Sequence, residues 1–432
     1  MLQDVDLLIP NSKYTEPCPG KVLCDLAHTK FHSRLSQPCI PAFKGQPVQT
    51  YPPRPKVQVC AAVTESGYED GAYTGLQGFR MPHGHQTENS LLAKIERCFA
   101  AGPAGKSPGV AGGRGGQVHI GIGDDAALFR PTRGCEIILT CDWFLEGTHF
   151  LRDRHPADSV GWKCLARALS DIAAMGGAPR CFLLSLAIPK SLTGAWLGDF
   201  LRGLRRAAQR FDCVLAGGDT TKRDEILIDI TVIGEVRKGR ALRRDGARAG
   251  DLLYVSGRLG EGEHGLRWLR RQRAVAHRRD VRLQKHLYPE PRLALGAWLG
   301  EQRLATAAMD LSDGLSSDLP RLCAASGVGA RVDAAKLPAV MLPPSTRRAP
   351  KRPRVHNGSG DALQLALHGG DDYELLFTVP KKKERQIPPS FRGIPLVSVG
   401  EITANRKIVL VGKESKPIIL RSLGWDPFRK HT

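Results

Sequence analysis

Aspartates beside glycines, or next to apolar runs, are the residues of this sequence with the clearest chemistry. They recur at Asp124, Asp125, Asp142, Asp171, Asp219, Asp310, Asp313, Asp371 and Asp372. Any one of them could cap a helix or close a turn, which is the commoner task of aspartate beside glycine or serine. Their repetition in one kind of setting, in a chain of formal net charge +20, favours a shared site instead.

Convergent carboxylates with few histidines and no clustered thiols are typical of a site for a hard cation, so we predict Mg²⁺. Proteins hold Mg²⁺ with a few carboxylates and leave its other positions to water and substrate phosphates. Many aspartates therefore predict several ions and a polyphosphate ligand, which indicates nucleotide chemistry. In the glycine segment at 217–221 (GGDTT), the backbone would approach the phosphates closely while Asp219 holds an ion.

The glycine turn at residues 121–125 fits a dinucleotide fingerprint in its loosest form. It reads GIGDD and directly follows the apolar run at 118–120. The acids argue against that interpretation, because two carboxylates would repel a pyrophosphate unless a cation lay between them. We interpret the turn as a metal site in which Asp125 is the better candidate ligand.

Two α/β blocks are expected to position these acids. The first has strand-like runs at 118–122, 135–141, 181–188 and 226–236, and helical patterns at 160–175 and 193–210. The second has strand-like runs at 251–256, 305–309, 374–379 and 407–411, and helices near 263–272, 290–301 and 314–325. We expect Asp142 to emerge at a strand end, since it follows the run Ile137-Ile138-Leu139.

Three regions follow from composition. Residues 1–86 contain ten prolines without sustained periodicity, which predicts an irregular or disordered extension. Residues 87–237 would form the first α/β domain, which would bind the nucleotide and Mg²⁺. Residues 238–432 would form a second α/β domain, interrupted by a basic, proline-rich insertion at 341–360.

The basic residues offer a function of a different class, a non-catalytic polyanion-binding protein. Arginine-rich runs occur at 202–210, 237–248, 267–282 and 347–354, but aromatic residues make up only 6% of the chain and no nucleic-acid-binding motif is present. We favour solvated helix faces and expect no specific nucleic-acid partner. No apolar segment is long enough for a membrane span, and the scattered cysteines suggest a reduced, cytoplasmic protein.

Six stretches, in order along about residues 88–428, match one known family. They are IGDDAALF, TCDWFLEGTHF, GWKCLARALSDIAAMGGAP, GGDTTKRD, MDLSDGLSSDL and GGDDYELLFTVP. The chain closely resembles the thiamine-monophosphate kinases, within the superfamily of aminoimidazole ribonucleotide synthetases. The resemblance implies transfer of the γ-phosphoryl group of ATP to thiamine monophosphate, which yields thiamine diphosphate.

The resemblance also implies a fold and a set of site residues. The fold is α/β (α+β) with two domains, and the N-terminal domains of a homodimer pair into a barrel. The implied Mg²⁺ ligands are Asp125, Thr140, Cys141, Asp142, Asp171, Asp219 and Asp310, with Asp313 at a further ion. Gly218, Asp219, Arg244 and Ser312 would contact ATP, and His149, Asp371 and Trp425 would face the thiamine phosphate.

The implied reaction needs no general base, since the acceptor phosphate is largely ionised at pH 7, its second pKa being about 6. Repulsion between two anions is the obstacle, and Mg²⁺, supported by Arg244 or Lys222, would remove it. Two residues and one stretch depart from the family pattern. Cys141 replaces Thr, Asp371 replaces Glu, and GEGEHGL at 260–266 replaces a small-residue run. Selenophosphate synthetases, hydrogenase-maturation proteins and purine-pathway synthetases share the pattern, but EGTHF and GGDDYELLF favour the thiamine kinases.

Overall fold

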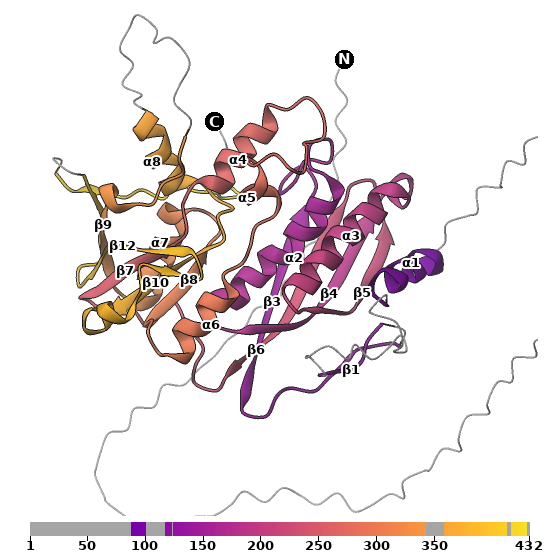
Figure 1. Cartoon of the computed structure of the whole chain (residues 1–432), viewed down its shortest axis with the longest axis horizontal. Helices are drawn as coiled ribbons and strands as arrows, with labels where there is room; N and C mark the ends of the chain where they lie inside the picture. The colour runs from indigo at the N-terminus through magenta and orange to yellow at the C-terminus, as the bar shows by residue number, and fades with distance from the viewer. Residues whose placement is uncertain (1–87, 101–116, 123, 343–357, 413–415, 430–432) are drawn as a thin grey trace, which may run out of the picture. The chain divides into compact units, whose positions relative to one another are not determined.

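The computed structural model of this chain describes residues 88–100, 117–122, 124–342, 358–412 and 416–429. The predicted extension at 1–86 and most of the predicted insertion at 341–360 lie outside the described residues. Figure 1 shows two β-sheets with helices packed against them. Residues 238–250 connect the last strand of the first sheet to the first strand of the second.

The first sheet has four strands in the order β3-β6-β4-β5. These are β3 (Cys135–Leu145), β4 (Ala178–Ile188), β5 (Val214–Lys222) and β6 (Leu227–Arg237). β3 and β4 run antiparallel to β6, whereas β4 and β5 are parallel. Successive side chains of a strand point to opposite faces, so each strand contributes to both faces of the sheet.

Helices α2 (Ala157–Ala174) and α3 (Ala195–Arg210) cover one face of this sheet, and α1 (Glu88–Ala100) packs near α3. Two glycines let α2 and α3 cross closely. A Cβ at Gly161 would lie 2.0 Å from the Phe200 carbonyl oxygen, and one at Gly203 would lie 1.8 Å from that of Asp158. We call the opposite side of the sheet the open face; hairpin β1 (Val118–Ile120) and β2 (Leu128–Phe129) packs there.

The second sheet follows the order β14-β13-β9-β12-β7-β10-β8, with β11 beside β12. Its strands are β7 (Asp251–Ser256), β8 (Ala307–Leu311), β9 (Gly329–Asp333), β10 (Glu374–Pro380), β11 (Ser390–Phe391), β12 (Ile394–Thr403), β13 (Ile408–Val411) and β14 (Ile418–Ile419). Neighbouring strands are antiparallel except β9 and β13.

Helices cover both faces of the second sheet. The helices of this part of the chain are α4 (Glu261–Arg270), α5 (Gln284–Leu287), α6 (Leu293–Glu301), α7 (Leu315–Ser326) and α8 (Gly358–His368), with short 3-10 turns η2 (Ala334–Lys336) and η3 (Lys381–Gln386). A further 3-10 turn, η1 (Lys190–Leu192), lies between β4 and α3. α7 and α8 pack in one core with β7, β8 and β10. On the other face, Leu299 of α6 shares a core with Ala173 of α2 and Phe377 of β10. α2 therefore lies between the two sheets and can carry side chains to both.

The predicted strands and helices are confirmed in type, with two differences that concern the site. β3 continues to Leu145, so Asp142 lies inside the strand and the prediction that it emerges at a strand end is wrong. The glycine segment at 217–221 lies within strand β5. β3 is longer than predicted because it pairs along its length with β6, and β5, which was not predicted as a strand, pairs along its length with β4.

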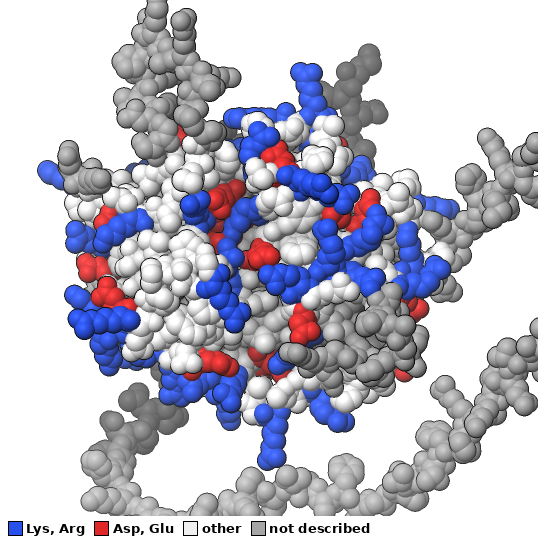
Figure 2. All heavy atoms as spheres, viewed as in Figure 1, with Lys and Arg blue, Asp and Glu red and all other residues white. Residues whose placement is uncertain are grey.

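On the face that Figure 2 shows, Lys and Arg side chains lie among Asp and Glu side chains. Of the arginine-rich runs, the one at 347–354 lies outside the described residues. Arg202 and Arg206 of α3 pair with Asp199 and Asp158, and Arg267 of α4 pairs with Glu263. These pairs agree with the interpretation as solvated helix faces. In the part of the chain that the structure describes, the cysteines are free thiols and no helix is long and apolar enough to span a membrane.

Candidate active site

Three acids lie on elements that pack together, Asp142 on β3, Asp171 on α2 and Asp310 on β8, and we call them the acid cluster. Asp142 lies on the face of β3 that packs against the helices, on the same side as the buried Phe144. Thr140, two residues earlier on the same face, donates a hydrogen bond from Oγ1 to Asp171 Oδ2 of α2 at 2.6 Å. Asp310 lies in β8 and is 5% exposed.

The acid cluster has more negative charge than the chain compensates. Burial, with the nearby Asp171 and against the opposing Arg167, raises the pKa of Asp142 to about 6. Burial and the charge of Asp171 raise the pKa of Asp310 to about 8, and Asp142 adds to that repulsion. A cation that binds between buried, mutually repelling carboxylates stabilises them, because it removes their repulsion.

Arg167 of α2 is the cation nearest to Asp142, and sequence reasoning missed it. Its Nη2 lies 3.9 Å from Asp142 Oδ1, and its Nη1 donates to the Trp143 carbonyl oxygen at 3.2 Å. The guanidinium lies over the ring of Phe144. Its buried Nε has no hydrogen-bond partner among the described residues. The site therefore has one buried donor available to an anionic ligand.

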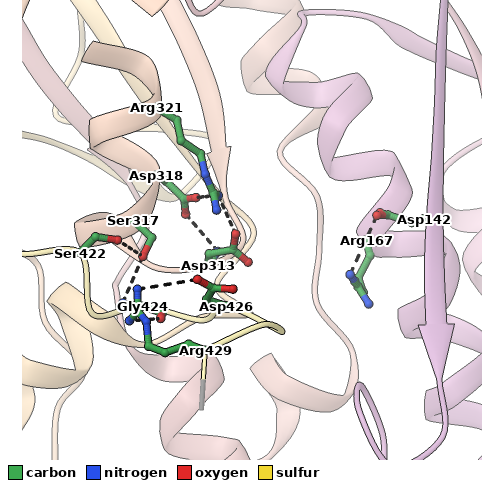
Figure 3. A network of polar contacts seen from close by, with 10 residues as sticks. All are labelled: Asp142, Arg167, Asp313, Ser317, Asp318, Arg321, Ser422, Gly424, Asp426 and Arg429. Carbon is green, nitrogen blue, oxygen red and sulfur yellow. Dashed lines mark hydrogen bonds and ion pairs between the residues drawn. The ribbon is translucent and has the colours of Figure 1, made fainter. Parts of the chain in front are cut away.

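Asp313 lies across from this pair, between β8 and α7, as Figure 3 shows. Its Oδ2 accepts a hydrogen bond from Arg321 at 2.6 Å. The C-terminal segment is fastened to the same turn, since the Trp425 backbone N–H donates to the Asp313 carbonyl oxygen at 2.9 Å. Gly424 N–H donates to Ser317 Oγ at 3.1 Å. Trp425, far away in sequence, is thus brought beside Asp313.

His149 follows β3 and is held by its own loop. The Leu145 N–H donates to its Nδ1 at 3.0 Å, and its ring stacks on Phe144. Burial lowers the pKa of His149 to about 4, with Arg167 adding to the shift and Asp371 opposing it. The ring is therefore neutral at pH 7.

Asp371 belongs to the loop between α8 and β10 and has a left-handed backbone, with φ of 64°. Its N–H donates to the Ser312 carbonyl oxygen at 2.8 Å, which brings two predicted site residues together. Its Oδ2 accepts from Lys163 Nζ at 2.7 Å, and its Oδ1 from Tyr373 Oη at 2.7 Å. Burial would raise the pKa of Asp371, but the charge and hydrogen bond of Lys163, together with the other nearby cationic groups such as Arg167, hold the pKa well below its usual range.

Other predicted residues lie on the open face, away from the acid cluster. Cys141 and Asp219 are exposed there, on the side of the sheet opposite to Asp142. The glycine turn lies against the same face, since a Cβ at Gly121 would contact the Ala216 carbonyl oxygen at 3.6 Å. Asp125, the last residue of that turn, is exposed. These residues form a second group.

Gly218 and Arg244 are also exposed. Gly218 has φ of 153°, and a Cβ there would lie 1.9 Å from the Leu184 carbonyl oxygen. The carbonyl oxygen of Arg244 accepts from Ser326 Oγ at 2.7 Å, and no described contact joins Arg244 to Ser312. In the described residues, no three His, Cys, Asp or Glu side chains are close enough to hold an ion by themselves.

Two buried acids beside the site have a structural task that the sequence did not reveal. Asp372 accepts hydrogen bonds from the N–H groups of Gly260 and Gly262, at the start of α4. A Cβ at Gly262 would lie 2.5 Å from the Asp371 carbonyl oxygen. Gly262 of GEGEHGL is thus explained, because helix α4 begins in contact with the loop that carries Asp371. Glu374 accepts from Lys285 at 2.5 Å and also pairs with Arg292.

The comparisons with known proteins agree with one family. The family model described as AIR synthase related protein, N-terminal domain, matches residues 123–236, and its C-terminal domain counterpart matches residues 248–413. The chain is 37% identical to the thiamine-monophosphate kinase of Salmonella typhimurium over 319 residues, which cover 72% of this chain and 93% of that protein.

Solved structures give the same result. The crystal structure of thiamine-monophosphate kinase from Stenotrophomonas maltophilia K279a is similar with a TM-score of 0.60 and 36% identity, over 69% of this chain and 92% of that one. The structure of AaThiL complexed with AMPPCP and TMP is similar with a TM-score of 0.55 and 30% identity, over 68% of this chain and 90% of that one.

Proposed function

The chain belongs to the thiamine-monophosphate kinases of the AIR synthase related family, and on that premise we propose that its acid cluster holds Mg²⁺ ions during the transfer. The chain is an enzyme that transfers a phosphoryl group from ATP to thiamine monophosphate and yields thiamine diphosphate. The proposal concerns how its residues make that transfer possible.

The observation that carries the proposal is the placement of Asp142, Asp171 and Asp310 where α2 packs against β3 and β8, with burial and repulsion among these acids raising the pKa values of Asp142 and Asp310. The carboxylate oxygens of these three acids and the Thr140 hydroxyl are the kind of ligand that Mg²⁺ prefers. A site short of a full protein cage suits Mg²⁺, which keeps water and phosphate ligands. When bound, Mg²⁺ would neutralise and align the phosphates. Asp313, and the second group of Asp125, Asp219 and Cys141, would hold further ions.

The chain's own residues would bind and orient the two anions. The available Nε of Arg167 would donate to a phosphate oxygen, and Arg244 or Lys222 would add positive charge. The Asp371 carboxylate accepts hydrogen bonds only, so it suits the amino group and the cationic ring of thiamine rather than its phosphate. Ser312 and Gly218 would contact ATP, and His149 and Trp425 would enclose the thiamine phosphate. In-line transfer then needs no general base.

The test is Asp142→Asn, which keeps the size of the side chain and removes its charge. Because burial and Asp171 already disfavour that charge, the melting temperature should stay unchanged or rise. Turnover should fall by roughly a hundredfold or more, as expected when one electrostatic group is removed from a transfer site. The measurement is thiamine diphosphate formation across a Mg²⁺ series.

A matched control is Asp333→Asn, since Asp333 accepts from the Ala335 N–H as a helix cap at η2. Asn caps about as well as Asp, so this variant should keep both stability and turnover. Near-normal turnover of a folded Asp142→Asn variant at the Mg²⁺ concentration that the natural chain requires would contradict the proposed magnesium site.

We also propose a homodimer built on the open face. Ile137, Leu139 and Trp143 of β3 alternate along that face and are 40%, 69% and 58% exposed. Large apolar side chains gathered on one strand face favour burial against another chain, and a second copy of this chain offers the same strand. Sedimentation should give a dimer for the natural chain and a monomer for Leu139→Glu. A monomeric natural chain at micromolar concentration would exclude this dimer.

A further inference from the structure

We propose that Lys163, supported by His286 and His155, is a positioning residue that fixes the Asp371 carboxylate for the cationic, hydrogen-bond-donating half of thiamine monophosphate. This inference rests on the proposed function of Asp371. It adds a group that does not touch the substrate itself and that the sequence motifs did not single out.

Lys163 is buried between the two halves of the site. It belongs to α2, beside the first sheet, and its side chain is 1% exposed. Its Nζ lies 2.7 Å from Asp371 Oδ2 and 3.3 Å from His286 Nδ1. Asp371 and His286 both come from the part of the chain that builds the second sheet. The ammonium therefore ties α2 to the loop that carries Asp371.

The two histidines complete this arrangement without adding charge. Burial lowers the pKa of His155 to about 3 and that of His286 well below its usual value, so both rings are neutral. An ammonium can only donate, so its hydrogen bond to His286 needs an unprotonated Nδ1. The ring proton of His286 is then on Nε2, which lies 3.1 Å from His155 Nε2 and donates to it.

The Asp371 carboxylate is consequently held at both oxygens. Lys163 donates to Oδ2, and Tyr373 donates to Oδ1 at 2.7 Å. The backbone adds a second constraint, because Asp371 has a left-handed conformation and its N–H donates to Ser312. The side chain is still 30% exposed. A charged acceptor is thus presented to a ligand in one fixed direction.

A structural role alone does not explain this lysine well. A buried ion pair often contributes little net stability, because removing both charges from water costs about as much as their attraction returns. Lys163 is also too buried to meet a substrate. The remaining consequence of its charge is that it keeps Asp371 ionised and fixes its position. Asp371 is the one described carboxylate that Lys163 contacts.

The experiment is steady-state kinetics of the full chain with Lys163→Met, varying each substrate in turn. We expect the KM for thiamine monophosphate to rise roughly tenfold or more, as for a lost hydrogen bond to a charged group. The KM for ATP should stay within about twofold, because Lys163 does not contact the residues proposed to bind ATP. In the Asp371→Asn background, Lys163→Met should add less than about twofold.

Two further variants keep the test decisive. His286→Gln, which leaves the lysine in place, should shift the same KM in the same direction by a few-fold, and it stands in if Lys163→Met does not fold. Arg180→Met removes a cation from the buried Glu235 far from this loop, so it should lower stability and leave both KM values unchanged.

Three outcomes would overturn the proposal: an unchanged KM for thiamine monophosphate in folded Lys163→Met and His286→Gln, an equal rise in both KM values, or full additivity with Asp371→Asn. Failure of the proposed function would be seen separately, as absence of thiamine diphosphate formation by the natural chain.

Discussion

Buried carboxylates at two places in this chain have opposite surroundings. In the acid cluster, Asp142 and Asp310 face other acids, and burial with that repulsion raises their pKa values to about 6 and about 8. Asp371 and Glu374, which we call the paired acids, face cations. Burial would raise the pKa of Glu374 too, but Lys285 and Arg292 outweigh burial and lower it.

The difference separates acids that need a bound cation from acids whose counter-charge the chain itself supplies. A paired acid is an anion at neutral pH because the chain supplies its counter-charge. An acid in the cluster lacks that counter-charge, so a cation from solution must provide it. Replacing an acid by its amide should therefore lose activity in the cluster, whereas at Glu374, the paired acid that is proposed to touch no substrate, it should lose stability.

The largest expected effect is on stability, for Glu374→Gln. The change leaves Lys285 and Arg292 partly buried without their carboxylate, and breaking a buried pair in this way costs about 3–5 kcal/mol. Denaturant unfolding followed by fluorescence measures this loss. Thiamine diphosphate formation per folded molecule should be kept, since Glu374 is proposed to touch no substrate.

The matched control for that variant is Glu401→Gln. Glu401 is 51% exposed and lies 3.7 Å from Arg331, so its loss should cost under about 1 kcal/mol. If Glu374→Gln and Glu401→Gln lost the same free energy of unfolding, the buried pairing of Glu374 would contribute no measurable stability. The distinction between the paired acids and the acid cluster would then fail.

A smaller effect concerns pH and the histidines that support the paired acid Asp371. His155, with its pKa lowered to about 3, and His286, with its pKa lowered well below 6.5, are neutral in the fold. The unfolded chain binds protons at both below about pH 6.5, so stability is lost as pH falls through that value. Each histidine contributes a slope of up to about 1.4 kcal/mol per pH unit.

Unfolding of His286→Gln between pH 7 and pH 5 measures this contribution, and its slope should be lower than that of the natural chain by about that amount. The groups that face His286 are Lys163, Asp371, His155 and Arg270. Exposed His277 is the control residue, and His277→Gln should keep the natural slope. An unchanged slope in His286→Gln would show that the ring is charged in the fold.

The sequence predicted the elements better than it predicted the faces of the elements. The apolar runs identified β3 and α2, but not that Asp142 lies inside β3 and points toward α2. Lys163, Arg167 and Glu374 lie within predicted elements, and their sequence setting resembles that of any helix or strand residue. Their partners are tens to more than two hundred residues away, so only the tertiary packing reveals which charges are compensated.

The smallest expected effect is that of Cys141→Thr, which tests whether Cys141, in the second group of residues, belongs to a magnesium site. Cys141 is exposed on the open face of β3, opposite to Asp142. Threonine suits an exposed strand position, so stability should change by less than about 0.5 kcal/mol. An oxygen donor binds Mg²⁺ better than sulfur, so the Mg²⁺ requirement for turnover should fall or stay the same. The measurement is turnover across a Mg²⁺ series beside the natural chain, and a sharply raised requirement would show that Cys141 belongs to no magnesium site.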